Sequence, residues 1–339
     1  MLAQRQARLA SAAVTVPFAD LSRRGQMRRL RAAADRVLAA YGLDEAVLRL
    51  VNHDFNATYR VDHEGERYAL RINTNSPHGV AAVEAEAVWV DALAADTDLV
   101  VPQPVRTTEG DLAAGIEITG LEGERGAVLY RWLDGPDLGE QASLRRLRAV
   151  GRATALLHQH TEQWQHPRGD DRPTMASIFM DEPNLIAGDA RISDDAHEVL
   201  AAAEREMRRH LDPLFAQPRQ LIHGDLHVWN TKWVDGRLAI IDFDDCGFGV
   251  PLQDLAISSY YVRDRAGAQA AILDGYEQVR PLPAHTDEQF EALVASRNLL
   301  LLNSIMPHVT AGMDDFLPGY VERTVTRMSG WLDTGVFDV

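Results

Sequence analysis

Hydrophobic and polar residues alternate in short runs over the first 135 positions and then follow longer, helical periods. Residues 20–42 predict a helix that ends at Gly42. Residues 58–63 and 67–73 alternate with a period of two on either side of a Glu-Gly-Glu turn, which predicts a β-hairpin. An amphipathic helix is predicted at residues 80–95. Three strands are predicted at residues 99–107, 113–119 and 125–133, and the strand at 99–107 is interrupted by two prolines.

The second part of the chain is mainly helical. Residues 143–161 and 193–215 have the apolar spacing of helices, and a strand-rich run at 220–245 precedes further helical sequence. The character of the chain changes near Asp134–Pro136. We therefore predict an α+β, bilobal protein. Its expected parts are an N-terminal extension with a helix, a small β-rich lobe and a larger helical lobe, at residues 1–42, 43–135 and 136–339.

Composition and charge narrow the class of protein. The chain has 339 residues, of which 46% are apolar and 25% charged, as is typical of a globular protein of about two domains. Its formal charge of −16 repels nucleic-acid phosphates and anionic membrane surfaces. The single cysteine, Cys246, excludes a disulfide framework and a cysteine-based zinc site. No apolar run is long enough for a membrane helix. We expect a cytoplasmic protein that binds neither nucleic acid nor membrane.

The residues of chemical interest gather in segment 221–256, which reads LIHGDLHVWNTKWVDGRLAIIDFDDCGFGVPLQDLA. The Asp-Gly pair at 235–236 lies between two apolar runs and predicts a tight hairpin, which brings Asn230 opposite residue 241 or 242 and so next to Asp242. Asp225 lies just before this hairpin and follows a glycine that permits a sharp backbone turn. We therefore expect the oxygen atoms of Asp225, Asn230 and Asp242 to converge.

This set of oxygen atoms favours a hard cation. Mg²⁺ prefers carboxylate and amide oxygens and takes only one or two protein ligands next to substrate phosphates. We predict Asn230 and Asp242 as these ligands, which leaves Asp225 to accept the proton of a hydroxyl group. Phosphoryl transfer by kinases divides the roles in this way, with an Asn five residues after the catalytic Asp. Each residue alone could be a turn or loop residue, but their joint spacing indicates catalysis.

The motif H-G-D-x-x-x-x-N at 223–230, followed by I-D-F-D at 241–244, resembles the aminoglycoside phosphotransferase and choline kinase superfamily, which has a protein-kinase-like fold. The following DDCGFGVPLQDLA is most similar to the branch of type II homoserine kinases and stress-response kinase A. The resemblance implies that Asp254 braces the catalytic loop and that His223 orders it by hydrogen bonding. Asp254 could at the same time be the N-cap of the next helix.

Two further acids of this segment have open roles. Asp244 and Asp245 could bind metal, contact a cationic acceptor or remain solvated. Lys232, the only lysine of the chain, shares a strand face with Asn230 and could approach phosphate or be an exposed strand residue.

The small lobe should hold the nucleotide. Kinase lobes of this kind use a strand cation, paired with a helix acid, to bind phosphates. Arg71 would be the cation, where the superfamily often has lysine, and Glu86 the acid, with Glu84 as the competing choice. Arginine can replace lysine here because guanidinium binds phosphate oxygens at two points and stays charged.

No glycine-rich phosphate loop precedes the hairpin. The superfamily commonly has a short turn with Asn in that place, which implies a phosphate-side contact for Asn56. It also implies that residues 128–133, with Tyr130 and Trp132, form the hinge whose backbone binds adenine.

We therefore predict a phosphotransferase that uses ATP and Mg²⁺ to phosphorylate a hydroxyl group of a small molecule. The acceptor would be an amino alcohol, an amino sugar, a homoserine-like compound or an aminoglycoside. The alternatives are a Ser/Thr protein kinase of the stress-response type and a nucleotide-binding regulator without transfer activity. Four acids of the helical lobe could receive an amine of the acceptor: Asp170, Asp171, Asp181 and Glu182.

Overall fold

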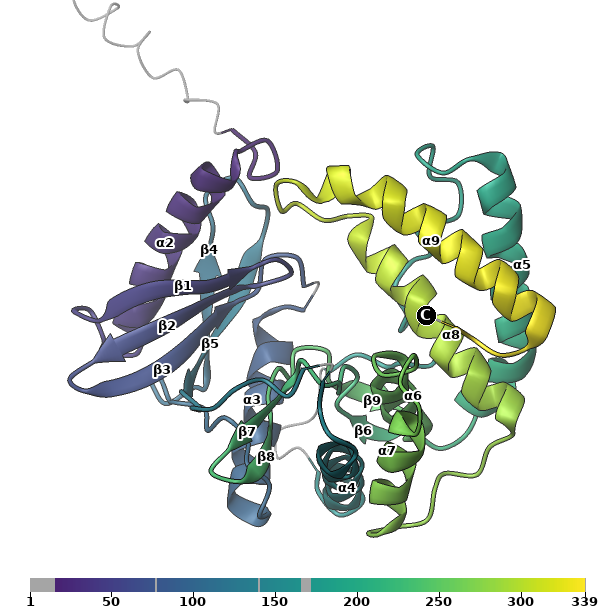
Figure 1. Ribbon diagram of the computed structural model, residues 1–339. Helices are drawn as coiled ribbons and strands as arrows, with labels where there is room; N and C mark the ends of the chain where they lie inside the picture. The colour runs from purple at the N-terminus through teal and green to yellow at the C-terminus, as the bar shows by residue number, and fades with distance from the viewer. Residues whose placement is uncertain (1–15, 77, 140, 166–171, 339) are drawn as a thin grey trace, which may run out of the picture.

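A computed structural model describes residues 16–76, 78–139, 141–165 and 172–338. A β-sheet part and a helical part lie side by side in it, which confirms the predicted α+β, bilobal architecture (Figure 1). We call these parts the N-lobe and the C-lobe. The predicted extension up to residue 15, and the candidate acids Asp170 and Asp171, lie outside the described residues. The exact boundaries of the lobes stay a prediction.

The N-lobe is built on one five-stranded antiparallel sheet with the strand order β1-β2-β3-β5-β4. Its strands are β1 Val47–His53, β2 Ala57–His63, β3 Glu66–Ile72, β4 Ala113–Glu117 and β5 Glu124–Arg131. The predicted hairpin is β2–β3, closed by a two-residue turn in which Glu64 and Gly65 both have positive φ. This turn type matches the twist of paired strands. The pattern analysis did not predict β1.

The predicted strand at 99–107 is wrong. Only two isolated bridges form there, between Val100 and Ala239 and between Pro104 and Tyr130. Proline has no N–H to donate, so a segment with Pro102 and Pro104 cannot form a continuous ladder. The segment instead runs along the sheet edge and ties it to the hairpin of the C-lobe.

Helices cover both faces of the sheet. Helix α2, Arg23–Ala40, packs on one face, and helix α3, Val80–Asp96, packs on the other. Successive residues of β5 show the division, because Ala127 and Leu129 join the hydrophobic core under α2 whereas Val128 joins the core of α3 and the C-lobe. A strand buried on both faces reads as a continuous apolar run, as β5 does.

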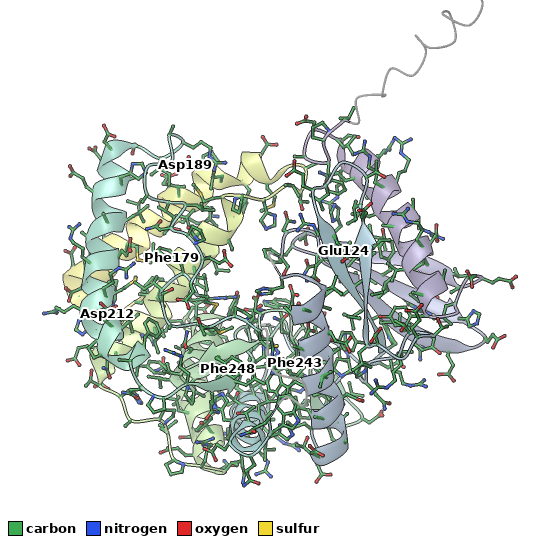
Figure 2. All side chains as sticks on the ribbon, turned by 180° about the vertical axis from the view of Figure 1, so that it is seen from behind. Glu124, Phe179, Asp189, Asp212, Phe243 and Phe248 are labelled. Atoms are coloured by element: carbon green, nitrogen blue, oxygen red, sulfur yellow. The ribbon has the colours of Figure 1, made fainter. Side chains whose placement is uncertain are left out.

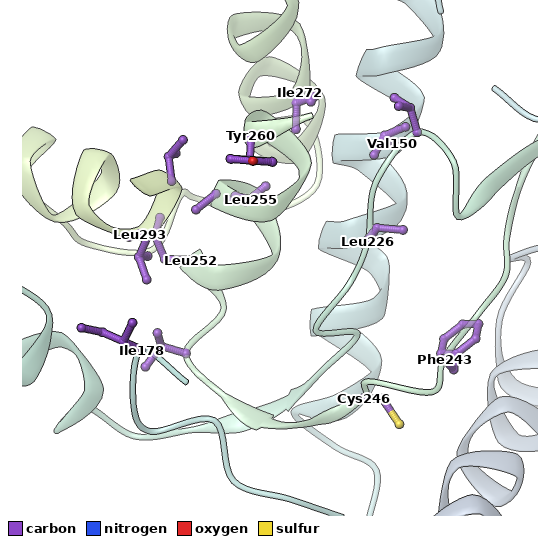
Figure 3. Packing of buried hydrophobic residues seen from close by; sticks show 14 of the residues in the cluster. Val150, Ile178, Leu226, Phe243, Cys246, Leu252, Leu255, Tyr260, Ile272 and Leu293 are labelled. Atoms are coloured by element: carbon purple, nitrogen blue, oxygen red, sulfur yellow. The ribbon is translucent and has the colours of Figure 1, made fainter. Parts of the chain in front are cut away.

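The C-lobe is mainly helical and, as predicted, has a small strand region at its centre. Its helices are α4 Leu144–Thr161, α5 Asp194–Phe215, α6 Leu252–Tyr260, α7 Ala268–Glu277, α8 Asp287–Ile305 and α9 Met313–Thr334. Its strands form two pairs, β6 Gln220–Ile222 with β9 Gly247–Gly249 and β7 Thr231–Val234 with β8 Arg237–Ile240. Figure 3 shows how side chains of α4, α6, α7 and α8 meet in one core. None of the described helices has the length and apolar character needed to cross a membrane.

The predicted Asp-Gly hairpin is present as β7–β8. Asp235 and Gly236 both have positive φ, as the turn requires. The ladder pairs Thr231 with Ile240, and the N–H of Ile241 donates to the carbonyl of Asn230 at 2.9 Å. Asn230 is thus opposite residue 241, one of the two registers that the sequence allowed.

A loop of the C-lobe is fastened to the N-lobe. The chain between α8 and α9 approaches the start of α2 (Figure 1). There the Gln26 side chain donates to the carbonyl of Val309 at 2.6 Å and accepts from the N–H of Ala311 at 3.0 Å. Asn75 accepts from the N–H of Val309 at 2.9 Å and donates to Thr310 at 2.9 Å. These bonds hold one side of the cleft between the lobes.

Helices α4 and α7 touch at two glycines, and this contact gives a test of the packing. A Cβ on Gly151 would lie 1.8 Å from the carbonyl oxygen of Ile272, whereas a Cβ on Gly330 in α9 meets nothing within 4 Å. We expect Gly151→Ala to lower the free energy of unfolding by about 3 kcal/mol. Gly330→Ala should raise it by about 0.5 kcal/mol, because it restricts the unfolded chain. Urea unfolding would measure both, and a tolerated Gly151→Ala would contradict the close crossing of α4 and α7.

Candidate active site

The catalytic-loop motif begins where β6 ends. Gly224 has φ +78°, and a Cβ there would lie 2.2 Å from the carbonyl oxygen of Asp245, so only glycine fits at this turn. His223 is fully buried; its Nδ1 accepts from the N–H of Asp225 at 3.3 Å and its Nε2 lies 3.2 Å from the carbonyl of Ile241. His223 thus connects the loop to the segment after β8 that carries Asp242, which agrees with the ordering role expected for it.

Asp254 lies beneath this turn. Its carboxylate accepts the backbone N–H groups of His223 at 3.0 Å and Gly224 at 2.8 Å, and it lies 3.0 Å from Nε2 of His158. Burial would raise the pKa of Asp254, but the hydrogen bonds and the charge of His158 outweigh it and hold the pKa below its ordinary value. Asp254 therefore braces the loop as a buried anion.

The alternative N-cap role for Asp254 is wrong. Helix α6 starts at Leu252, and Pro251 is at the N-cap position with no side-chain hydrogen bond. Asp254 is therefore already inside the first turn, and its carboxylate points to the loop.

The Asp225 carboxylate is held on both oxygens. Oδ2 accepts from the side-chain amide of Asn230 at 2.8 Å and lies 3.4 Å from Nε2 of His227. Oδ1 accepts from a guanidinium N–H of Arg297, which comes from α8. Burial would raise the pKa of Asp225, but the charges of Arg297 and His227 outweigh it, so the pKa is below its ordinary value. Asp225 is therefore an anion.

Asn230 and Asp242 offer oxygen atoms beside this carboxylate. Asn230 uses its amide nitrogen for Asp225, and its side-chain oxygen accepts no hydrogen bond from the residues that the structure describes. About half of the Asp242 side-chain surface is open to the cleft (48%), and Arg71 at 3.9 Å is its only ion-pair partner among the described residues. Asp242 also has φ +64°, a left-handed backbone conformation that is uncommon for residues other than glycine.

The electrostatics of Asp242 suit a bound cation. Its carboxylate lines the same part of the cleft as Asp225, Asp244 and Asp245. Desolvation raises its pKa to about 7, aided by the charges of Asp244 and Asp225. Within the described ranges no group of three or more His, Cys, Asp or Glu side chains is arranged to hold a metal. One amide and one carboxylate oxygen nevertheless match the ligand set that Mg²⁺ takes beside substrate phosphates.

The predicted cation and helix acid of the N-lobe form an ion pair. Arg71 of β3 donates to Glu86 of α3 at 2.8 Å, and both side chains are buried. The hydroxyl of Tyr130 donates to the same carboxylate at 2.7 Å. The competing acid Glu84 instead accepts two backbone N–H groups at the start of β4. The acid that pairs with Arg71 is therefore Glu86 and not Glu84.

Asp244 belongs to this N-lobe network. Its oxygens accept from the amides of Asn56 at 2.7 Å and Asn73 at 3.1 Å and lie 3.2 Å from the Arg71 guanidinium. The Asn56 amide oxygen in turn accepts the N–H of Thr74 at 3.1 Å. These contacts join the two lobes and orient Arg71. Asp244 and Asn56 also line the cleft, and the acceptor contact expected for Asp244 and the phosphate contact expected for Asn56 stay predictions.

Asp245, unlike Asp244, has no polar partner among the described residues. It makes no hydrogen bond and no ion pair with any described residue, and it lines the cleft. Burial, together with the charges of Asp225 and Asp244, raises the pKa of Asp245 well above its ordinary value.

Two cavities meet at this site. The hinge-side cavity, of about 350 Å³, is lined by Trp132 and Leu133 of the hinge and by Asn230. The helix-side cavity, of about 320 Å³, is lined by Asp225, Asp245 and residues of α8. Four residues line both cavities: Asn52, Thr58, Arg71 and Asp242. Seen from behind, Phe243 lies beside α3, and Phe179, which lines the helix-side cavity, lies on the C-lobe (Figure 2).

Two further expectations concern single residues. Lys232 lines the hinge-side cavity, and its ammonium group contacts Asp137 at 2.7 Å and the carbonyl of Gly135 at 3.1 Å. Of the acids expected to face an acceptor, Glu182 lines the helix-side cavity, whereas Asp181 does not and instead accepts from the hydroxyl of Thr174.

The sequence analysis missed Arg297, His227, Tyr261 and Asn73. Arg297 has a visible signal, since it is the only Asp, Glu, Lys or Arg between Glu291 and Asp314. A single charge in an apolar helix requires a buried partner, which identifies such a residue without naming the partner. The other three carry no comparable signal.

The chain is similar to known phosphotransferases over most of its length. The model of the phosphotransferase enzyme family (APH) matches residues 47–288. Amicoumacin kinase of Bacillus subtilis (strain 168) is 24% identical over 231 residues, 66% of this chain and 66% of that protein. A homoserine kinase of Sinorhizobium medicae (strain WSM419) is 30% identical over 211 residues, 59% of each chain. Both matches thus span slightly less than two thirds of the relative's own length.

A solved structure extends the similarity to 91% of the chain. The microcompartment-associated aminopropanol kinase has a TM-score of 0.73 and 25% identity, and the match covers 91% of this chain and 99% of that chain. The expected resemblance to this superfamily and to homoserine kinases is confirmed.

The brace under the loop can be tested by substitution. Asp254→Ala leaves two backbone N–H groups and His158 without their acceptor in the core, so we expect the free energy of unfolding to fall by about 3–5 kcal/mol. A matched control is Asp274→Ala, which removes a surface carboxylate 3.5 Å from Arg148 and should cost less than about 1 kcal/mol. Equal losses for the two variants in urea unfolding would show that Asp254 does not brace the loop.

Proposed function

Because this chain belongs to the phosphotransferase enzyme family, we propose that it transfers the γ-phosphate of ATP to a hydroxyl group of a small molecule. One observation carries the proposal: two cavities meet at Arg71 and Asp242, with Asn230 on one side and Asp225 on the other. A donor and an acceptor bound in these cavities would face each other at the residues suited to phosphoryl transfer.

The hinge-side cavity is the proposed nucleotide site. Apolar residues such as Ala69, Pro102 and Ile241 line it and suit a flat base. The N–H groups of Arg131 and Trp132 already bond to the carbonyls of Gln103 and Arg67. In the described chain no acceptor receives the N–H of Leu133, which makes it the hinge donor for adenine. Phosphates would then extend toward Arg71.

Asn230 and Asp242 would hold the Mg²⁺ ion. When bound, the ion would neutralise phosphate charge and offset the repulsion between ATP and the acids of the cleft. Arg71 keeps its charge at every working pH, because Asp244 and Glu86 outweigh the desolvation that would lower its pKa. Glu86 and Asp244 hold the guanidinium at the point where the two cavities meet.

Asp225 would align the acceptor hydroxyl and accept its proton. Its low pKa makes it a weak base, which suffices when the proton moves late, after the bond to the leaving phosphate has largely broken. The protein would therefore act mainly by positioning the two substrates and by fixed charges.

The helix-side cavity supports a cationic acceptor. Asp245 and Glu182 line it, and Asp245 has no partner among the described residues. An ammonium group beside Asp245 would relieve the repulsion that raises the pKa of this acid. The two arginines that line the cavity, Arg71 and Arg297, already bind carboxylates of the protein. An amino alcohol or amino sugar therefore fits better than a homoserine-like acceptor, whose carboxylate would lack a free cation in the described part of the lining.

The catalytic assignment predicts a separation of binding and turnover. With an amino alcohol as acceptor, Asp225→Asn should lower kcat by about 10³-fold, because the hydroxyl loses its proton acceptor. Saturating ATP and Mg²⁺ should still raise the melting temperature of this variant as in the wild type. Radiolabelled phosphate transfer and thermal shift would measure the two effects.

Two outcomes would contradict the proposal. Near-normal turnover by Asp225→Asn would remove Asp225 from catalysis. Stabilisation of the wild type by ATP and Mg²⁺ without transfer to any amino alcohol, amino sugar or aminoglycoside would favour the nucleotide-binding regulator.

The acceptor assignment predicts a selective effect on KM. Asp245→Asn should raise the KM for 1-amino-2-propanol by at least about tenfold, which corresponds to 1.4 kcal/mol, and should leave the KM for ATP nearly unchanged. The uncharged analogue 1,2-propanediol serves as the control, because its weak phosphorylation should not depend on Asp245. If the substitution impairs both acceptors by the same factor, Asp245 does not recognise the amine.

A further inference from the structure

An arginine outside the recognised motifs is bound to the proposed catalytic carboxylate. Arg297 lies in the middle of α8, and only 5% of its side chain is exposed. One of its terminal N–H groups donates to Oδ1 of Asp225, and the same nitrogen lies 3.1 Å from the hydroxyl of Tyr261. The guanidinium also lies over the Tyr261 ring, 5.7 Å from its centroid. The charged group is therefore fixed in position by two neighbours.

Tyr261 connects this arginine to the other side of the carboxylate. Its ring lies 3.9 Å from that of His227, with the planes tilted by 31°. Nε2 of His227 is 3.4 Å from Oδ2 of Asp225. A closed ring of contacts thus runs from Arg297 through Tyr261 and His227 to Asp225. Its members come from α8, from the end of α6 and from the catalytic loop, so the position of the carboxylate depends on three separate segments.

The charge balance of the cleft explains why such a support is needed. Four aspartates line the helix-side cavity within one small volume: Asp225, Asp242, Asp244 and Asp245. Arg71 is engaged by Glu86 and Asp244. Arg297 is therefore the arginine of this lining that compensates Asp225. Without it, repulsion from the other acids would favour rotation of the Asp225 carboxylate away from the acceptor, and its buried charge would lose its main partner.

We propose that Arg297 is a positioning residue for phosphoryl transfer, which holds the Asp225 carboxylate in the orientation that receives the acceptor hydroxyl. This inference rests on the proposed function. Arg297 donates to Oδ1 and Asn230 to Oδ2 of this carboxylate, and Asp225 lines the helix-side cavity. Arg297 lowers the basicity of Asp225, but a weak base suffices when the proton is transferred late. Arg297 also fixes the orientation of the Asp225 carboxylate.

The test compares Arg297→Met with Arg263→Met. Arg263 is a matched control, since it is also a largely buried C-lobe arginine (11% exposed) paired with a carboxylate of α8, Glu291, but it lines neither cavity. With 1-amino-2-propanol as acceptor, we expect Arg297→Met to lower kcat by about 10²-fold, as misplacement of a reacting group does. The KM for ATP should change by less than about threefold, since nucleotide binding does not use Arg297. Arg263→Met should leave both constants nearly unchanged.

A double-mutant cycle shows whether Arg297 acts through Asp225. In the Asp225→Asn background, Arg297→Met should produce little further loss of kcat, because the group that it positions is gone. A loss as large as in the wild-type background would overturn the proposal. Arg297→Gln, which keeps the length and polarity of the side chain, replaces Arg297→Met if that variant does not fold and should lower kcat in the same direction.

The outcomes separate this inference from the function on which it rests. A wild-type protein that transfers no phosphate to any acceptor would end the proposed function and this inference with it. Efficient transfer by the wild type together with unchanged kcat in Arg297→Met would overturn the positioning role alone. The positioning role would also be overturned if the KM of Arg297→Met for ATP rose by the same factor by which its kcat fell.

Discussion

Repulsion between carboxylates at the bottom of the cleft is the constraint on which the rest of this structure depends. Asp225, Asp242, Asp244 and Asp245 line the same cavity, and each needs a partner, a cation or a raised pKa to remain there. Asp225 forms an ion pair with Arg297, and Asp244 forms one with Arg71. Asp242 and Asp245 have no comparable partner among the described residues, and both have raised pKa values. These two acids are therefore the ones prepared for ligands from outside, in our proposal a metal ion and an ammonium group.

The same pairing holds the two lobes together. Asp244 follows the β7–β8 hairpin of the C-lobe, yet its partners Arg71, Asn56 and Asn73 all belong to the N-lobe. On the other side of the cleft, the loop between α8 and α9 is bound to Gln26 and Asn75. The charge balance of the site therefore depends on the relative position of the lobes, because Arg71 of the N-lobe neutralises Asp244 of the C-lobe.

The catalytic loop shows how a short motif depends on distant segments. Gly224 allows a turn that no other residue fits, and Asp254 accepts the N–H groups that this turn exposes. Asp254 in turn contacts His158 of α4. A buried carboxylate without these donors would be unfavourable, so the loop, α6 and α4 can only be stable as a set.

What the sequence alone determined about this protein was local. The Asp-Gly turn and the alternation around it placed Asn230 next to Asp242, and the five-residue spacing placed Asp225 beside Asn230, because strand geometry and turn type act over a few residues. The strand expected at 99–107 failed because two prolines cannot complete a ladder. The tertiary structure alone decided which partners the charges have: Arg297 is 72 positions from Asp225 and Asn56 is 188 positions from Asp244. Coulomb interactions depend on distance in space, and no periodicity along the chain records which distant residues the packing of two lobes brings together.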